Sequence, residues 1–216
     1  AQYYDPSQLF LEKQLRLSDY KTFFHLADIN GGKRLPKGES FVESGFPYVR
    51  VVDIQNGFID SSKVVSISED IWRVISNYDL KLDDVLITIV GNTVGLSGIL
   101  SYDLGIANFT ENCARIRNAK INPYYILAFL ISKYGQNQVN REKVGTSQPK
   151  LSLDRLRRFK IFCPKELELK EISNTVKKSA ESNSLSQLNF RKAISLLEKE
   201  LGLDKITFEK KKSYMA

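Results

Sequence analysis

The feature that most constrains this chain is a long segment near its end, residues 166–201, which contains neither proline nor glycine. Eight positions in it alternate by four and three residues, which is the spacing of a coiled-coil heptad. Gly202 follows directly and is suited to end a helix. The pattern predicts one long coiled-coil-type helix over residues 165–202, with a seam made of Val176, Ala180, Asn183, Gln187, Phe190, Ile194, Leu197 and Leu201.

A single helix of this length cannot bury its seam by itself, so the pattern also predicts a partner helix. We expect that partner to come from another chain or from a part of the protein that lies outside this sequence. Two amides, Asn183 and Gln187, lie in the middle of the seam. Buried amides weaken a coiled coil, but they can fix its register and its choice of partner.

The charge balance favours an acidic partner. The 216 residues include 32 Lys and Arg against 25 Asp and Glu, which gives a formal net charge of +7 and a pI of about 9.3. Nucleic acid suits such an excess, because each cation that neutralises a phosphate releases counterions. Part of the excess lies in a predicted basic tail, residues 203–216, which is equally compatible with a solvated end.

Composition also excludes several classes of protein. No run approaches the roughly 18 to 20 apolar residues of a membrane span, and no charged leader precedes an apolar stretch. Two cysteines, Cys113 and Cys163, are too few for a disulfide scaffold, and His25 alone cannot build a multi-histidine metal site. We expect a compact cytoplasmic protein that uses no metal ion or other cofactor and contacts no membrane.

Short β-type runs separated by turns precede the long segment, at residues 48–52, 57–60, 63–67, 84–90, 95–100, 114–117 and 159–163. A short helix is predicted after Asn122, a suitable N-cap, with Pro123 in its first turn and Gly135 just past its end. The fold class is therefore α+β. We expect a curled, mostly antiparallel β domain with short helices over residues 1–164, followed by the long helix.

Two patterns suggest catalysis, and simpler explanations account for both. The run Asn122-Pro-Tyr-Tyr is similar to a motif of amino-methyltransferases, but it lacks the second proline and also reads as a helix start. Glu168-Leu-Lys170 and Glu209-Lys-Lys211 match half of a metal-dependent nuclease core, a half that Lys/Glu-rich chains contain by chance. The sequence shows no convincing active site, so we expect a binding protein and not an enzyme.

Three irregular stretches combine cations, small polar residues and glycine, at residues 31–38, 91–95 and 143–150. Such side chains can read base edges or contact phosphates, although ordinary turns use the same residues. Three of them on one basic chain raise the expectation of nucleic acid. The main alternative is a protein-interaction module whose basic loops are only solvated.

Several segments, in this order, resemble a known family. They include Gly31-Gly-Lys-Arg-Leu-Pro-Lys-Gly, Asp83-Asp-Val-Leu-Ile-Thr-Ile-Val-Gly-Asn-Thr-Val-Gly and Gly145-Thr-Ser-Gln-Pro-Lys-Leu-Ser, together with residues 47–59, 122–126 and 156–164 and the long helix. The series is similar to a target recognition domain plus spacer helix from the DNA specificity subunit of type I restriction–modification systems. The resemblance covers nearly the whole chain, although no single motif is diagnostic.

This resemblance implies a non-catalytic reader of double-stranded DNA. Such subunits usually hold two recognition domains that each read half of a split site. Antiparallel spacer helices keep the domains apart and bind adenine methyltransferase subunits, which in turn meet the restriction subunit. One domain and one helix would then be either a half-subunit that dimerises or a fragment. The recognition domain of a fused restriction–methylation enzyme is a further possibility.

By the same resemblance, we expect the loops to enter the major groove while Lys and Arg side chains fix the backbone register. The residues expected to contact DNA are Lys33, Arg34, Lys37, Arg50, Asn92, Thr93, Lys143, Thr146, Ser147, Gln148 and Lys150.

Overall fold

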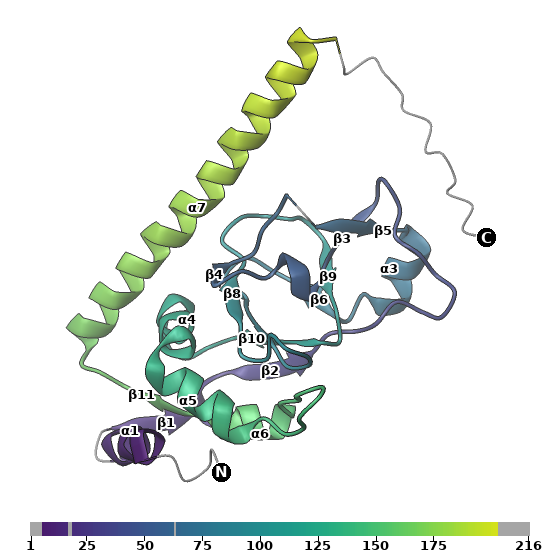
Figure 1. Cartoon of the computed structure of the whole chain (residues 1–216). Coiled ribbons are helices and arrows are strands. Elements are labelled where there is room, and N and C mark those ends of the chain that lie inside the picture. The colour runs from purple at the N-terminus through teal and green to yellow at the C-terminus, as the bar shows by residue number, and fades with distance from the viewer. Residues whose placement is uncertain (1–5, 17–18, 63, 203–216) are drawn as a thin grey trace.

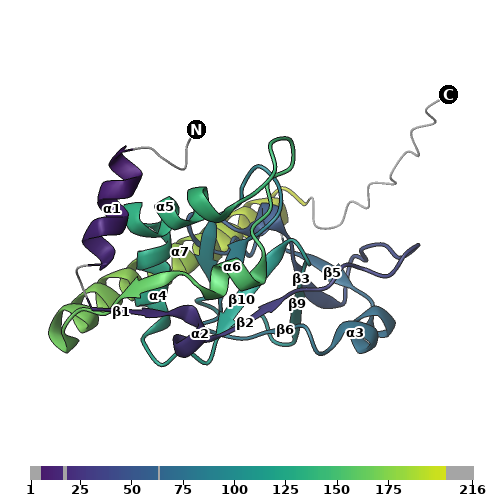
Figure 2. The same ribbon diagram turned by 90° about the horizontal axis from the view of Figure 1, so that it is seen from below.

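The computed structural model of the protein describes residues 6–16, 19–62 and 64–202. The predicted basic tail, residues 203–216, lies outside the described residues. Figures 1 and 2 show a mixed domain of sheets and short helices, with one long helix along its side. The helices are α1 (Pro6–Arg16), α2 (Phe23–Leu26), α3 (Glu69–Ile75), α4 (Pro123–Ile131), α5 (Lys133–Glu142), α6 (Leu153–Arg157) and α7 (Glu166–Glu200), with a 3-10 turn η2 (Val51–Asp53).

The strands form three sheets. The largest has the order β2 (Asp28–Gly31), β10 (Cys113–Arg117), β7 (Val85–Thr88), β8 (Ser97–Ile99) and β4 (Gly57–Phe58). The second has the order β5 (Val65–Ile67), β3 (Phe46–Val49), β9 (Ala107–Phe109) and β6 (Asp79–Leu80), and β1 (Tyr20–Thr22) pairs with β11 (Lys160–Phe162). The pairs β3–β9 and β4–β8 are parallel, and the other described pairs are antiparallel. The α+β prediction is confirmed.

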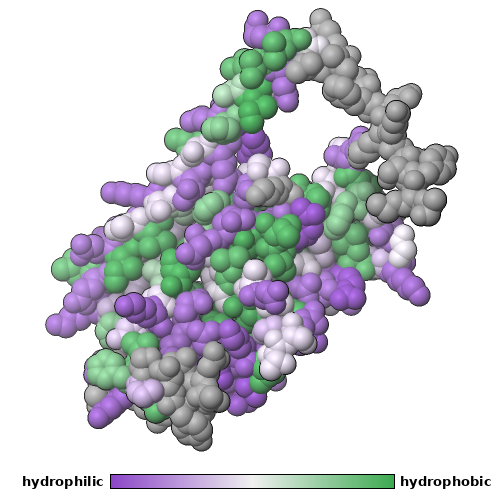
Figure 3. Space-filling view, viewed as in Figure 1, coloured by the Kyte–Doolittle hydropathy of each residue, from purple (hydrophilic) through white to green (hydrophobic). Residues whose placement is uncertain are grey.

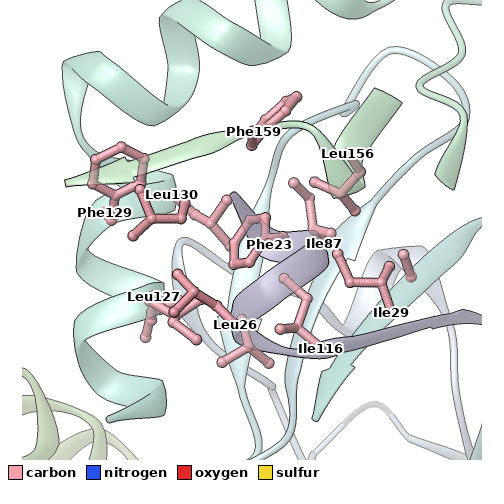
Figure 4. Packing of buried hydrophobic residues seen from close by; sticks show 14 of the residues in the cluster. Phe23, Leu26, Ile29, Ile87, Ile116, Leu127, Phe129, Leu130, Leu156 and Phe159 are labelled. Carbon is pink, nitrogen blue, oxygen red and sulfur yellow. The ribbon is translucent and has the colours of Figure 1, made fainter. Parts of the chain in front are cut away.

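The two faces of strand β10 pack against two different cores. Ala114 and Ile116 pack into the larger core, whereas Cys113 belongs to a second core with Leu86 and Phe109. This alternation follows from the two-residue period of a strand. Figure 4 shows side chains of α2, α4, β7 and β10 converging in the larger core, among them Phe23, Leu26, Ile87, Ile116, Leu127 and Leu130.

Two arginines of β10 tie the large sheet to the second one. Arg115 Nη1 lies 2.8 Å from Asp79 Oδ1 in β6, and Arg117 Nη1 lies 2.9 Å from the same oxygen. Arg117 Nη2 also lies 2.6 Å from Asp84 Oδ2 at the entrance to β7. Burial would raise the pKa of Asp79, but the bonds and charges of Arg117 and Arg115 lower it. These largely buried pairs neutralise one another's charge, so the sheets are joined by ion pairs as well as by packing.

The predicted helix at residues 122–135 is right at its start and wrong at its end. Asn122 Oδ1 accepts the Tyr124 N–H over 2.9 Å, which confirms the N-cap. The helix stops at Ile131, however, and Ser132 caps a further helix, α5, that the sequence did not predict. Gly135 lies inside α5, where a Cβ atom would come within 2.3 Å of the Phe129 carbonyl oxygen. Glycine is needed there because α5 folds back closely on α4.

The long helix α7 runs from Glu166 to Glu200 and confirms the predicted long helix. Its first half packs on the chain's own domain: Leu169, Val176 and Ala180 contact the larger core, and Ala180 is only 3% exposed. Ser61 donates from both its N–H and its hydroxyl to Gln187 Oε1, each over 3.2 Å. The expectation that every seam position needs a partner helix is therefore wrong for Val176, Ala180 and Gln187, because this domain supplies their contacts.

Beyond Gln187 the helix projects past the domain (Figure 1), and apolar side chains stand at the surface of its free end (Figure 3). Phe190, Ile194, Leu197 and Leu201 are 70%, 45%, 60% and 62% exposed. Their spacing of four, three and four residues places them in one stripe. Asn183 is exposed as well. The part of the seam still open to a partner is thus its C-terminal half.

Gly135→Ala tests the close approach of α4 and α5. The exchange favours a helix by about 1 kcal/mol in isolation. We expect it instead to lower the free energy of unfolding by about 1–3 kcal/mol, because the new methyl group meets backbone oxygens. Urea unfolding measures the difference. Gly31→Ala is the control, since its Cβ would first meet Leu153 Cδ1 at 3.7 Å, and a Gly135→Ala protein as stable as this control would contradict the assignment.

Candidate nucleic-acid interface

The three predicted loops meet at one end of the five-stranded sheet. β2 and β7 both pair antiparallel with β10, with Gly31 opposite Ala114 and Thr88 opposite Cys113. The chain therefore leaves both strands beside the start of β10. Because only β10 separates these strands, their ends lie about 10 Å apart. The loop that follows β2 and the loop that follows β7 share one surface, which we call the loop surface.

Loop 32–38 is held to this end by main-chain contacts. A Cβ atom at Gly32 would lie 2.3 Å from the carbonyl oxygens of Phe109 and Thr110, so only glycine allows the chain to cross there. The Lys33 N–H donates to the Phe109 carbonyl over 3.0 Å, and the Tyr48 hydroxyl donates to the Lys33 carbonyl over 2.7 Å. Burial raises the pKa of Tyr48 to about 12, which keeps this hydroxyl a donor. The loop is fixed through its backbone while the Lys33 side chain is exposed.

The other two loops are bonded to each other. Val144 and Lys150 exchange both main-chain hydrogen bonds over 2.8 Å, which makes residues 144–150 a closed hairpin. The Gly91 N–H donates to the Pro149 carbonyl over 2.9 Å, so this hairpin is hydrogen-bonded to the start of loop 91–95. Gly91 and Gly145 have φ values of +95°, a backbone conformation that favours glycine. Stretches about fifty residues apart in the sequence thus form one unit.

Helix α5 supports this unit from behind. Gln136 Nε2 donates to the Gly95 carbonyl over 3.0 Å and to the Leu130 carbonyl over 2.8 Å. Arg155 Nη1 donates to the Glu142 carbonyl over 2.9 Å, at the end of α5 where the hairpin begins. Sequence reasoning missed Arg155, in α6, because its partner Glu142 lies 13 positions away, and it missed Gln136 because α5 carries few apolar side chains. The N-cap Ser132 is the one local signal that could have revealed it.

The structure places most of the predicted contact residues on the loop surface with exposed side chains. These are Lys33, Arg34, Lys37, Asn92, Thr93, Thr146, Ser147, Gln148 and Lys150. Lys143 is partly covered, and its Nζ donates to Asn140 Oδ1 over 2.8 Å.

Arg50 has a structural contact as well as a place beside this surface. Its Nη2 lies 3.1 Å from Oδ1 of the fully buried Asp53, and its own N–H donates to Asp53 Oδ2 over 2.8 Å. The guanidinium also lies 5.6 Å from the centre of the Phe41 ring. Arg50 therefore holds η2 in place, while it borders a hollow that Arg34 also lines.

One residue of the loop surface was not predicted. Glu111 lies in the turn between β9 and β10, and Arg34 Nε donates to its Oε1 over 2.6 Å. The Thr110 hydroxyl donates to Glu111 Oε2 over 2.9 Å. Partial burial would raise the pKa of Glu111, but the bonds from Arg34, its own N–H and Thr110, with the charge of Arg34, lower it. No sequence pattern singles this acid out, because its partner lies 77 positions away.

The family model for the type I restriction modification DNA specificity domain matches residues 19–194. The chain belongs to this family. The match includes the loop surface and most of α7, and it confirms the resemblance found in the sequence. Members of the family recognise DNA sequence and carry no catalytic centre of their own, so this specificity domain is a DNA-recognition module of a restriction–modification system. No curated protein matches the sequence significantly.

Two solved structures share the fold of the specificity domain. A structure described as showing complex assembly and conformational transition of the type I restriction–modification system has 14% identity and a TM-score of 0.56 over 91% of this chain and 50% of its own. The type IIG restriction endonuclease BpuSI has 9% identity and a TM-score of 0.59 over 82% of this chain and 28% of its own. The S subunit from M. genitalium has 18% identity and a TM-score of 0.48 over 73% and 37%. The chain thus spans half or less of each of these proteins.

Two of the residues that suggested catalysis, Asn122 and Glu168, have structural roles in the specificity domain, whereas Glu209 and Lys211 lie outside the described residues. Asn122 caps α4, and Glu168 accepts the Lys165 N–H over 2.9 Å at the start of α7. Cys113 is buried, which raises the pKa of its thiol. Over the described ranges, no three His, Cys, Asp or Glu side chains are grouped to hold a metal ion. Within the same ranges, no helix is long and apolar enough to cross a membrane.

Proposed function

We propose that this specificity domain reads one half of a split double-stranded DNA site, as a specificity subunit or half-subunit of a type I restriction–modification complex. The observation that carries the proposal is the joining of the three loops on one surface. Each loop alone resembles an ordinary turn, but together they present lysines and an arginine beside amides and hydroxyls. Cations of this kind suit phosphates, and amides and hydroxyls suit base edges in the major groove.

Side-chain chemistry indicates which residues of the loop surface would contact the DNA backbone and which would contact bases. Lys33, Lys37 and Lys150 carry point charges on flexible stems, which suits contacts to the DNA backbone. Asn92 and Gln148 carry amides that can pair bidentately with adenine, and Thr93, Thr146 and Ser147 can bond to a base or a phosphate. These amides and hydroxyls stand at turns braced by α5, so their positions are fixed before DNA arrives. Pre-organised loops lose less conformational entropy on binding.

The free half of α7 supplies the second part of the proposal. The stripe of Phe190, Ile194, Leu197 and Leu201 would pair with the same helix of a second copy, or of a second half of the subunit, in antiparallel orientation. In Figure 1, α7 lies on the opposite side of the domain from the connection between α5 and α6 that contains residues 143–150. Pairing through α7 would therefore leave the loop surface free. Two such domains would read two half-sites at a distance set by the helices.

The complex would also contain an adenine methyltransferase subunit and a restriction subunit, which this chain directs to the site. No cofactor is needed for the reading itself, and a cytoplasmic location stays a prediction. The likeness in fold to a type IIG endonuclease supports one alternative, a recognition domain within a fused restriction–methylation enzyme. Catalytic motifs elsewhere in the same polypeptide would favour that alternative. A protein-interaction module with a generic basic surface is the other alternative.

Selection from a random duplex pool tests the proposal. The purified protein should retain duplexes that share a short motif at moderate salt, and joined copies should enrich a spaced inverted repeat. Sequencing of the retained pool gives the result. Retention that depends on salt but shows no motif, with or without the methyltransferase subunit, would favour the interaction module instead.

Lys33→Ala tests a backbone contact. We expect weaker binding by a similar factor on every duplex, because a phosphate contact carries no base information. The slope of log affinity against log salt should become shallower by about 0.9. Titrations of a selected and an unrelated duplex at several salt concentrations measure both effects. Lys178→Ala on α7 is the control, and an unchanged slope for Lys33→Ala would remove this side chain from the interface.

Gln148→Ala tests a base contact. We expect a loss of about 1–3 kcal/mol on the selected duplex, confined to one base pair of the motif. Binding to single-base-pair variants of that duplex measures where the loss falls, and the unaffected positions serve as the control. An equal loss on every duplex would show that Gln148 contacts a phosphate.

A further inference from the structure

A carboxylate stands in the middle of the loop surface, where a phosphate-binding protein would not place one. Glu111 is 29% exposed and pairs with Arg34, whose side chain is 78% exposed. An acid that faces DNA repels the phosphate backbone unless it is compensated or reads a base. Exposed ion pairs add at most about 1 kcal/mol to stability, so folding alone explains little of this arrangement.

Glu111 is held more firmly than its partner. The turn that carries it is anchored on three sides: the Thr110 N–H donates to Val49, the Ile89 N–H donates to Asn112, and Gly32 donates to Cys113. Both carboxylate oxygens are already bonded, Oε1 by Arg34 and Oε2 by Thr110. Glu111 is therefore a fixed acceptor, and Arg34 is the side chain that it orients.

The contact to Glu111 uses only one edge of the guanidinium. Arg34 donates through Nε, and its terminal Nη1 and Nη2 groups have no hydrogen-bond partner among the described residues. These two terminal groups together offer two parallel N–H donors, which is the arrangement that pairs bidentately with two acceptors. Because Glu111 neutralises the charge, an anionic phosphate is a poorer ligand for this edge than a neutral base.

We infer that Arg34, positioned by Glu111, reads a guanine through its O6 and N7 atoms in the major groove. The inference rests on the proposed function, and it assigns one base of the unknown site. Guanine alone among the four bases offers two adjacent acceptors on its major-groove edge. Arg34 is a specificity-determining residue for this base, and Glu111 is a positioning residue that also keeps phosphates away from it.

Arg34→Ala tests the contact itself. The wild-type protein should enrich a guanine at one position, and Arg34→Ala should lose that preference while it keeps the rest of the motif. At that position, replacing the guanine should weaken wild-type binding roughly 5- to 150-fold. A duplex with 7-deazaguanine, which lacks the N7 acceptor, should bind the wild type more weakly and should bind Arg34→Ala no differently from the unmodified duplex.

Glu111→Gln tests the role of the carboxylate, since it keeps the shape and removes the charge. We expect weaker discrimination at the same guanine and a slope of log affinity against log salt that is steeper by about 0.9, because Arg34 can then bind a phosphate. A residue that only stabilises the loop would change neither the base preference nor the slope in this direction. Arg73→Ala and Glu69→Gln remove a similar exposed pair, 2.7 Å long, in α3, and should leave both measurements unchanged.

The possible outcomes separate this inference from the proposed function. Loss of the guanine preference in Arg34→Ala together with a steeper slope in Glu111→Gln supports it. A motif that Arg34→Ala leaves intact, or an equal loss on all duplexes, overturns the inference while DNA reading stands. A wild-type protein that selects no motif overturns both. Melting temperatures close to that of the wild type show that the variants are folded.

Discussion

The architecture depends on the main-chain pairing of β10 with two antiparallel neighbours. Because β2 and β7 run in the same direction on either side of it, both deliver their following loops to the end where β10 begins. The same strand carries Ala114 and Ile116 to one core, and Arg115 and Arg117 to the carboxylate of Asp79 in the other sheet. Loop position, core packing and the junction of the sheets are therefore consequences of a single pairing. A register shift of one residue would exchange the two faces of β10. It would thereby disrupt the loop positions, the core packing and the junction of the sheets.

Helix α7 shows how one heptad pattern serves two kinds of contact. From Leu169 to Gln187 its inner face lies on the domain through Leu169 and Val176 and through smaller side chains. These include Ala180 and Ser184, whose hydroxyl lies 2.7 Å from that of Ser101. From Phe190 onward the seam side chains, Phe190, Ile194, Leu197 and Leu201, are large, apolar and exposed. Small residues allow the helix to approach its own domain closely, and large ones give a stripe for another helix. The docked half fixes the direction in which the free half projects.

The features that could be predicted from the sequence are those that depend on residues close together in the chain. The Asn122 cap, the long helix and most β-type runs depend on nearby residues, and the structure confirms them. Helix α5 was missed because it has few apolar side chains, and because Gln136 and Gly135 make contacts with α4 and loop 91–95 that leave no local signal in the sequence. Glu111 was missed for the same reason, since Arg34 is 77 positions away. The seam was assigned wholly to a partner helix because periodicity tells which side of a helix is buried, but not what covers it.

The hairpin of residues 144–150 keeps its shape through its main chain, which leaves the side chains at its tip free to vary in evolution. Its shape is fixed by main-chain bonds between Val144 and Lys150 and between Gly91 and Pro149. The side chains of Thr146, Ser147 and Gln148 make no hydrogen bond to other described residues. Substitutions at these tips should leave the free energy of folding almost untouched. Under the proposed function, a new target preference could therefore arise by substitution at these three positions, with no compensating change in the interior.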